Sequence, residues 1–228
     1  MQRFLDIIFS VIALIFFLPL LLFVSIILML TGEGEIFFFQ ERVGIDGDLF
    51  KLYKFSTMIK NSPNIGTGTV TLRDDPRILP FGNFLRKTKI NELPQLLNIL
   101  KGDMSFVGPR PQALRCFNAF SLKHQKMIIK VLPGLSGIGS IIFRNEENMI
   151  GQQKNPQLFY DNVIMPYKGR LEEWYVNNAS IPLYFKVLFL TLWAIFFPKS
   201  ELAFKLIYNI PFPNPYLLKH IRKSHVRH

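Results

Sequence analysis

The hydrophobic pattern of the chain begins with a long apolar run near the N-terminus. Residues Ile7 to Leu30 read "IIFSVIALIFFLPLLLFVSIILML" and contain no charged side chain. A helix of this length reaches roughly 36 Å, which exceeds the apolar core of a bilayer, about 30 Å thick. The run is too long for a signal peptide, and no small-residue cleavage site follows it. The pattern therefore predicts a membrane-embedded helix.

Pro19 lies inside this run and predicts a bend, because proline removes one backbone hydrogen bond and clashes with the preceding turn. Two arrangements contain such a bend: a kinked helix that crosses the membrane, and a helix-break-helix hairpin that enters one leaflet and returns. Hydropathy alone favours the crossing helix. Arg3 is the only basic residue before the run, so the positive-inside rule places the bulk of the chain in the cytoplasm. The short N-terminal end leaves open an arrangement with both ends on that side.

The segment after the apolar run carries strand, turn and helix signals in that order. Residues 36–60 predict short strands joined by a turn at "GIDGD". Residues 61–80 are rich in Pro, Gly, Asn and Asp and predict a loop. Residues 82–101 carry leucines at helical spacing, and Pro94 predicts a break with a new helix starting near Asn91. A helix that starts there would point free N–H groups at a neighbouring phosphate.

Helical patterns dominate the rest of the chain. Residues 112–130 predict a helix, and the glycines of the following "LPGLSGIGS" lack the spacing of a phosphate-binding loop. Residues 167–178 predict an amphipathic helix. Residues 181–198 are apolar but too short to cross a membrane, and an interfacial helix and a buried core helix fit them equally well.

Composition narrows the class of protein. The chain has 228 residues, a formal charge of +11 and 49% hydrophobic residues, with 23 Phe among them. A disordered basic tail would be much less apolar, whereas a basic and apolar chain suits an anionic membrane surface. Nucleic acid is the rival partner, but the sequence has no recognition helix or aromatic-basic motif, so we expect no nucleic-acid binding. The single cysteine, Cys116, excludes an internal disulfide.

The densest group of chemically useful side chains lies in "KINELPQLLNILKGDMSFVGPRP", residues 89–111. It contains the carboxylates of Glu92 and Asp103 and, between two prolines, the guanidinium of Arg110. Carboxylates bind Mg²⁺ through oxygen, and a guanidinium binds phosphate oxygens in a bidentate manner. This stretch is therefore the first candidate for a functional site.

The same stretch is part of a longer pattern. "LRKTKINELPQLLNILKGDMSFVGPRP" resembles the R-K-T-x-x-D-E-L-P-Q-L-x-N-V-L-x-G-D-M-S-x-V-G-P-R-P block of the bacterial sugar transferases, the monotopic phosphoglycosyl transferases. The stretches "FFFQERVG", "FKLYKFSTM", "PGLSG" followed by Arg144, and "WYVNNAS" resemble further blocks of this family. The resemblance runs from about Arg3 to Thr191, most of the chain.

The resemblance implies a reaction, a cofactor and a location. Family members move a phosphosugar from a nucleotide-sugar, usually a UDP-sugar, to a polyprenyl phosphate such as undecaprenyl phosphate, and UMP leaves. They use Mg²⁺ and an Asp-Glu dyad, whose Asp forms a covalent phosphosugar intermediate. The product starts a surface glycan, such as O-antigen, capsule, exopolysaccharide or a glycoprotein glycan, at the cytoplasmic face of the bacterial inner membrane. The sugar, the pathway and a homodimeric state are left open.

The resemblance also changes the predicted fold. Family members enter one leaflet through a helix broken at a proline, which favours a re-entrant hairpin at Pro19 over a crossing helix. We therefore predict an α+β, mostly helical fold with a re-entrant membrane helix, a small β segment and amphipathic interfacial helices. Residues 1–32 are the membrane element, 33–198 a cytosolic or interfacial catalytic domain, and 199–228 a basic tail with solvated histidines.

The predicted site combines cations with a few acids. Four cationic side chains are the candidates for binding the diphosphate of the donor: Arg110, Arg144, Arg86 and Lys54. Glu92 and, less directly, Asp103 are the candidates for Mg²⁺. Two alternatives stay open: Asp103 caps a turn, and Arg86 lies at the membrane face without touching phosphate.

Asn91 stands where the family's nucleophilic Asp normally lies, and an amide oxygen is a very poor nucleophile. Three explanations compete: Glu92 takes over as nucleophile, the residue is an engineered substitution, or the chain is a relative with altered or lost activity. The first is preferred, because the surrounding block is intact. The third would make the chain a membrane adaptor on the same scaffold.

Four further departures from the family pattern stand out. Leu18 replaces a frequent Ser, Ser56 replaces a frequent Arg, and Tyr184 replaces a frequent Asp. Residues 138–160 also differ from the usual sequence after the "PGLSG" block. A change in that segment predicts a change in the accepted sugar.

Overall fold

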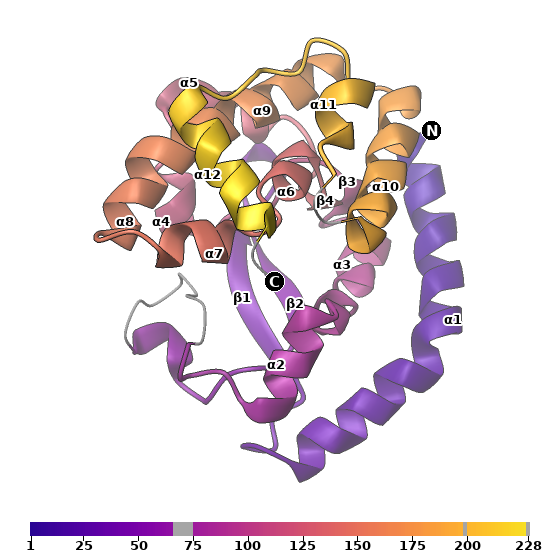
Figure 1. Cartoon of the computed structure of the whole chain (residues 1–228). Helices are drawn as coiled ribbons and strands as arrows, with labels where there is room; N and C mark the ends of the chain where they lie inside the picture. Colours follow the sequence, from indigo (N-terminus) through magenta and orange to yellow (C-terminus); the bar gives the residue numbers. More distant parts are fainter. Residues whose placement is uncertain (66–74, 198–199, 227–228) are drawn as a thin grey trace.

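The computed structural model describes residues 1–65, 75–197 and 200–226 (Figure 1). Its α-helices are α1 Gln2–Leu30, α2 Pro80–Lys87, α3 Gln95–Lys101, α4 Leu114–Phe117, α5 Leu122–Ile128, α6 Ile138–Ile142, α7 Glu146–Gly151, α8 Pro156–Phe159, α9 Met165–Asn178, α10 Ile181–Phe196, α11 Leu202–Leu206 and α12 Pro215–Val226. The strands are β1 Phe37–Val43, β2 Leu49–Phe55, β3 Ser105–Val107 and β4 Gly134–Ser136. Short 3-10 or π segments are η1 Ile45–Gly47, η2 Ser62–Asn64, η3 Ile90–Glu92 and η4 Tyr160–Ile164. The predicted mostly helical fold with a small β segment is confirmed.

The N-terminal helix α1 is continuous through Pro19 and changes direction near its middle (Figure 1). By length and composition it is apolar enough to cross a membrane. Many of its large apolar side chains are exposed, among them Phe4, Ile12, Ile15, Phe16, Leu22, Phe23 and Ile26. The structure thus has one bent helix where the sequence predicts a break, and the re-entrant arrangement stays a prediction.

Both ends of α1 contact the same globular body. In its first turn, Arg3 donates hydrogen bonds to two backbone carbonyls at the end of α3. In its last turns, Val24 and Leu28 are buried in a cluster with Phe55 and Leu85, which come from β2 and α2. The helix is therefore held to the rest of the molecule at its beginning and near its end.

A buried carboxylate joins α1 to α10. Asp6 is fully buried, and its Oδ1 accepts hydrogen bonds from the Tyr184 hydroxyl at 2.9 Å and from the Phe106 backbone N–H at 3.2 Å. Tyr184 stands where the family often has an Asp. A second carboxylate there would face Asp6, and two ionised carboxylates can only accept hydrogen bonds. The tyrosine hydroxyl supplies the missing donor.

The predicted strands form an antiparallel hairpin. β1 pairs with β2 from Phe37 opposite Phe55 to Val43 opposite Leu49. The "GIDGD" turn is tight because Asp46 and the glycine after it both take positive φ, 56° and 87°. The hairpin places Lys54 and the polar residues of β1 beside the segment that follows α2.

The helix predicted over 82–101 is interrupted, and the second helix begins later than the sequence predicts. α2 ends at Lys87, Lys89 takes a left-handed conformation with φ 62°, and η3 follows. α3 begins at Gln95 with Pro94 at its N-cap. The prediction of a helix start near Asn91 is therefore wrong: Asn91 lies in η3 and caps no helix. The helix predicted over 112–130 is also divided, into α4 and α5.

A short parallel pair of strands fixes the segment that carries Arg110. β3 pairs with β4 through Ser105 opposite Gly134 and Val107 opposite Ser136. The backbones approach so closely that a Cβ on Gly134 would lie 2.1 Å from the backbone nitrogen of Gly108. Gly134 and Gly137 therefore serve close packing of backbone against the backbone of Gly108, whereas Gly139 makes room for the Glu172 side chain.

The main hydrophobic core lies among α6, α9, α10 and the C-terminal helices. Val187 and Leu190 of α10 are buried in this core, whereas Phe189 and Phe196 on its other side are exposed. One face of α10 is therefore part of the core, and the interfacial placement of its exposed face stays a prediction. Segment 199–228, predicted to be a basic tail, contains α11 and α12, whose buried face joins the same core. The predicted loop over 61–80 falls partly on residues 66–74, outside the described residues.

Candidate functional site

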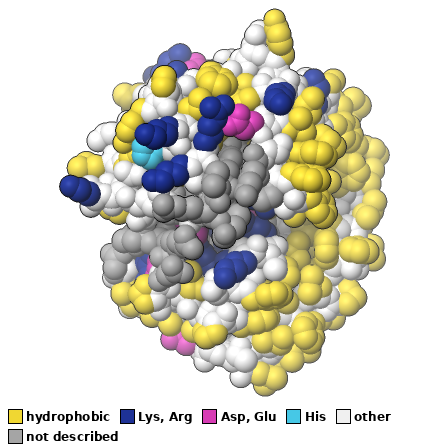
Figure 2. Space-filling view, in the orientation of Figure 1, with side chains coloured by type: hydrophobic (Ala, Val, Ile, Leu, Met, Phe, Trp, Pro, Cys, Tyr) yellow, Lys and Arg dark blue, Asp and Glu magenta, His cyan; other side chains and the backbone are white. Residues whose placement is uncertain are grey.

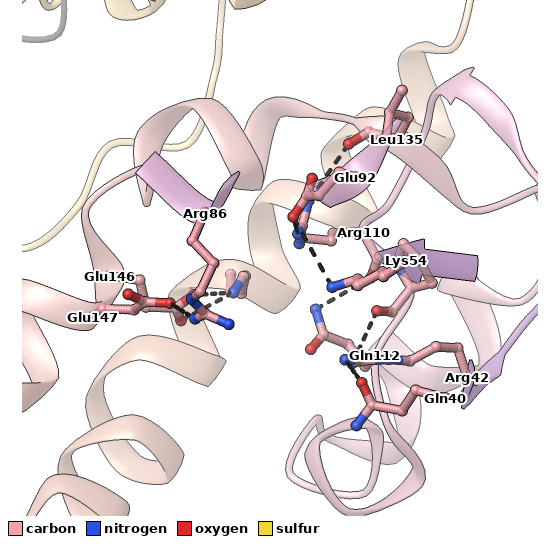
Figure 3. A network of polar contacts seen from close by, with 12 residues as sticks. Gln40, Arg42, Lys54, Arg86, Glu92, Arg110, Gln112, Leu135, Glu146 and Glu147 are labelled. Atoms are coloured by element: carbon pink, nitrogen blue, oxygen red, sulfur yellow. Dashed lines mark hydrogen bonds and ion pairs between the residues drawn. The ribbon is translucent and has the colours of Figure 1, made fainter. Parts of the chain in front are cut away.

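The centre of the candidate site is the carboxylate of Glu92 between two cations (Figure 3). Glu92 Oε1 lies 2.6 Å from Arg110 Nη2 and 4.0 Å from Lys54 Nζ. The three side chains come from η3, from the loop after β3 and from β2, so the break before α3, the glycine-packed strand pair and the hairpin all position this site. The structure therefore brings together three residues that the sequence predicted as parts of one site.

The cations keep Glu92 ionised. Burial alone would raise the pKa of its carboxyl, but the charges of Arg110 and Lys54 outweigh burial and hold that pKa well below its usual range. Burial lowers the pKa of the Lys54 ammonium to about 7, and the charge of Glu92 limits the fall. At neutral pH the Glu92 carboxylate is negative, and Lys54 is near its pKa, so both its charged and its neutral form are populated.

Arg42 is a further cation of the site that the sequence analysis did not select. It lies on β1, its Nη1 donates to the Pro111 carbonyl at 3.3 Å, and its Nη2 donates to Gln40 Oε1. Burial and then the charge of Arg110 lower the pKa of Arg42 to about 10. The sequence pattern that could have identified Arg42 is the period-two alternation of β1, which places Gln40 and Arg42 on the inward face of the strand.

Arg86 lies beside this group but has a partner of its own. Its Nη2 is 2.8 Å from Glu147 Oε1, on α7 (Figure 3). The charge of Arg86 contributes to the lowered pKa of Lys54, so the two cations are near each other. Arg144 precedes α7, and burial lowers its pKa. Among the described residues Arg144 makes no ion pair, and the structure does not join it to Glu92.

Asn91 has the burial expected of a site residue. It is 5% exposed, and its Oδ1 is a buried oxygen without a hydrogen-bond partner in the described part of the chain. The Nε2 of Gln95, at the start of α3, is also buried and unpaired. Unpaired buried polar atoms are uncommon in folded proteins and indicate a place where a ligand or water binds.

Asp103 lies at the other end of α3 from Glu92, and the structure does not bring the two carboxylates together. Asp103 Oδ2 accepts a hydrogen bond of 3.0 Å from Asn98 Nδ2, and Asn98 also bonds to the backbone of Lys51 and Tyr53 in β2. Asp103 thus orients Asn98, which holds α3 against the hairpin, and this supports the alternative that Asp103 stabilises the turn after α3.

The residues around Glu92 fit a magnesium ion of low protein coordination. The described residues contain no cluster of three or more His, Cys, Asp or Glu side chains that could hold a metal by themselves. Mg²⁺ needs only one or two protein oxygens when substrate phosphates and waters complete its shell. The Glu92 carboxylate and the unpaired Asn91 Oδ1 are two such oxygens on neighbouring residues.

Known proteins are similar to this chain over most of its length. A family model described as bacterial sugar transferase matches residues 1–198. The UDP-glucose:undecaprenyl-phosphate glucose-1-phosphate transferase of Escherichia coli (strain K12) is 32% identical over 202 residues, which are 86% of this chain and 40% of the relative. The uncharacterized sugar transferase EpsL of Bacillus subtilis (strain 168) is 37% identical over 172 residues, 75% of each chain.

A third relative is named for another sugar. The UDP-N-acetylgalactosamine-undecaprenyl-phosphate N-acetylgalactosaminephosphotransferase of Aeromonas hydrophila is 36% identical over 143 residues, 62% of this chain and 34% of the relative. The chain thus spans less than half of the length of this relative and of the one from Escherichia coli. The length of the family match and the identities lead to one conclusion: the chain belongs to the bacterial sugar transferase family.

Proposed function

We infer that this chain transfers a sugar phosphate from a UDP-sugar to undecaprenyl phosphate and releases UMP. The observation that carries the proposal is the charge of the site: one carboxylate, Glu92, lies among the cations Arg110, Lys54 and Arg42. This excess of half-buried positive charge matches a diphosphate, whose charge must be neutralised during transfer. Relatives named for glucose and for N-acetylgalactosamine leave the sugar undetermined.

Glu92 is the proposed nucleophile. Its pKa is held low, so it is a carboxylate at neutral pH, and its hydrogen bond to Arg110 is the contact that a phosphate would replace. Once the diphosphate binds Arg110, a Glu92 oxygen attacks the phosphorus that carries the sugar. The bond from that phosphorus to the bridging oxygen breaks, and UMP leaves with the electron pair. An oxygen of the polyprenyl phosphate then attacks the same phosphorus and restores the Glu92 carboxylate.

Other groups neutralise charge during these steps. Mg²⁺, held by Glu92 and Asn91 Oδ1, would offset the charge that develops on the leaving UMP. Arg42 and Lys54 hold their cationic heads beside Arg110, and a bound diphosphate raises the affinity of Lys54 for its proton. Asn91 thus acts as an oxygen ligand and not as the attacking group.

The membrane arrangement proposed is monotopic. Both ends of α1 contact one globular body, whereas a straight crossing helix would hold its ends on opposite sides of the bilayer. Figure 2 shows hydrophobic side chains covering the side of the molecule where Figure 1 has α1 and α10. We propose that α1 dips into the cytoplasmic leaflet of the inner membrane with its bend deepest, while the exposed face of α10 rests at the headgroups.

The test is release of UMP from a panel of UDP-sugars by the full chain in lipid nanodiscs with undecaprenyl phosphate and Mg²⁺. We expect Glu92→Gln to lose activity at least a thousandfold and to form no phosphosugar adduct by intact mass spectrometry. Asn91→Asp should remain active. Glu173→Gln is the matched control, since it makes the same chemical change at a half-buried acid of α9 that pairs with Lys123 and not with the cations of the site.

The outcomes separate the candidate roles. Full activity of Glu92→Gln would show that another residue attacks the phosphorus. Activity that appears only in Asn91→Asp would show that the natural amide disables the reaction. A chain that releases no UMP in any variant would be an adaptor on this scaffold, and the catalytic proposal would fail.

A further inference from the structure

Helix α7 brings two carboxylates to the cations of the proposed donor site. Glu147 Oε1 lies 2.8 Å from Arg86 Nη2, and both oxygens of Glu146 lie 3.0 Å from Lys168 Nζ (Figure 3). The charges of Glu146 and Glu147 add to that of Glu92 in raising the pKa of Arg110, so α7 faces the same cluster. Carboxylates at a site for a diphosphate oppose its binding and therefore need a physical explanation.

The two carboxylates differ in their freedom to move. The Lys168 side chain is 3% exposed and Glu146 is 23% exposed, so this pair is enclosed and joins α7 to α9. Glu147 is 54% exposed, and exposed ion pairs are weak. Glu147 is therefore free to leave Arg86 when a stronger partner, such as a phosphate, takes the guanidinium.

Helix α7 is held in place from behind. Met149 and Ile150 are buried in the main core, which also contains Leu217 and Ile221 of α12. Asn145, at the start of α7, donates a hydrogen bond of 3.4 Å to the Ser224 carbonyl. Because α12 braces α7, the position of Glu147 relative to Arg86 is defined by the fold and not by a loose surface segment.

An ionised carboxylate accepts hydrogen bonds and donates none. On a UDP-sugar, hydroxyl donors lie on both sides of the diphosphate, on the sugar and on the ribose, and only those of the sugar differ between donors. A carboxylate one side chain away from the phosphate-binding arginines is therefore placed to bind them, and its hydrogen bonds distinguish hydroxyls of different orientation.

We propose that Glu147 is a specificity-determining residue of the donor site: it pairs with Arg86 in the free protein and binds sugar hydroxyls once the diphosphate takes Arg86. This inference rests on the proposed function and assigns recognition of the sugar hydroxyls to α7. It also gives a physical reason for the sugar-specific role predicted for segment 138–160.

The test compares a UDP-sugar with UDP, which lacks the sugar. The KM for the best UDP-sugar and the inhibition constant of UDP are measured for the wild-type chain and for Glu147→Ala in nanodiscs. We expect the KM to rise at least tenfold, because the hydroxyls lose their acceptor. The inhibition constant of UDP should stay equal or fall, because Arg86 no longer has a competing carboxylate.

A second readout and a matched control complete the design. Discrimination between UDP-sugars that differ at one hydroxyl should fall about tenfold in Glu147→Ala and about threefold in Glu147→Gln. Glu173→Ala removes a half-buried acid that pairs with Lys123 on α5 and should change neither constant.

The outcomes distinguish this proposal from the one on which it rests. Equal increases in both constants would show that Glu147 acts on the part shared by both ligands, by binding the ribose or by supporting the fold of the site. An unchanged KM with a lower inhibition constant would show that Glu147 only competes for Arg86. Either result overturns the specificity role and leaves the proposed reaction standing, whereas a wild-type chain without turnover overturns both.

Discussion

Glu172 offers a direct test of the charges inside the domain. It lies on α9, is 2% exposed, and neither carboxylate oxygen has a hydrogen-bond partner in the described structure. Its Oε1 occupies the space beside Gly139, where a Cβ would be only 2.4 Å away. Burial raises the pKa of this carboxyl from 4.5 to about 8, although Lys168 and the backbone of Arg110 oppose the rise.

The sign of the effect on stability follows from proton binding. Between the two pKa values the folded protein keeps the proton and the unfolded chain releases it, so stability falls as pH rises through this window. At about 1.4 kcal/mol per pH unit, the loss between pH 5.5 and pH 8 is about 3 kcal/mol. Glu172→Gln has nearly the same shape and no charge, so it should not show this loss.

The measurement is thermal unfolding of the purified chain in one detergent at pH 5.5 and pH 8. For a chain of this size, about 3 kcal/mol corresponds to roughly 6–12 °C. The melting temperature of Glu172→Gln should gain that much relative to the wild type between the two pH values. Glu173→Gln changes the neighbouring acid, which is paired with Lys123, and should melt in parallel with the wild type. Parallel melting of Glu172→Gln would refute the argument and show that Glu172 is ionised in the folded state.

Three further predictions use the same purified chain. Tyr184→Phe removes a hydrogen bond to the Asp6 carboxylate and should lower the free energy of unfolding by about 1.5–3 kcal/mol. Tyr175→Phe removes a hydrogen bond to a backbone carbonyl and should lower it by about 0.5–1.5 kcal/mol. Equal shifts in thermal unfolding would contradict this order. UDP should inhibit less strongly above pH 7 as Lys54 loses its proton, and Lys54→Arg should flatten this profile to pH 9; an unchanged profile would exclude Lys54. Gly134→Ala should destabilise the chain by at least about 2 kcal/mol and abolish activity, because its Cβ would collide with Gly108; wild-type unfolding and activity would show that the strand pair separates freely.

The elements that the sequence predicted well are those with a local signal. The hairpin has a turn with its own chemistry at "GIDGD", and α10 has a long apolar pattern with a serine at its N-cap, whose hydroxyl accepts from Leu183 N. The start of α3 was misplaced because Asn91 and Glu92 look like cap residues. Lys89 takes a left-handed conformation, so that η3 precedes α3, and the sequence carries no glycine there that would indicate such a conformation.

The site was predictable where residues share one sequence block and not where they meet through the fold. Glu92 and Arg110 lie in one recognisable stretch, and the structure joins them. Asp103 lies in the same stretch but bonds to Asn98, since α3 separates it from Glu92. The pair of Arg86 and Glu147 links positions 61 residues apart, and nothing in the linear pattern of either segment indicates the other.

The end of the family match does not coincide with the end of the folded core. The match stops at residue 198, yet Ile207, Leu217 and Ile221 complete the apolar interior beyond it. A chimera that contains residues 1–198 alone would expose part of the hydrophobic core to water at the place where α12 packs. A unit for transfer into another member of the family must therefore include residues 200–226, because these residues bury part of the core formed by residues 1–198.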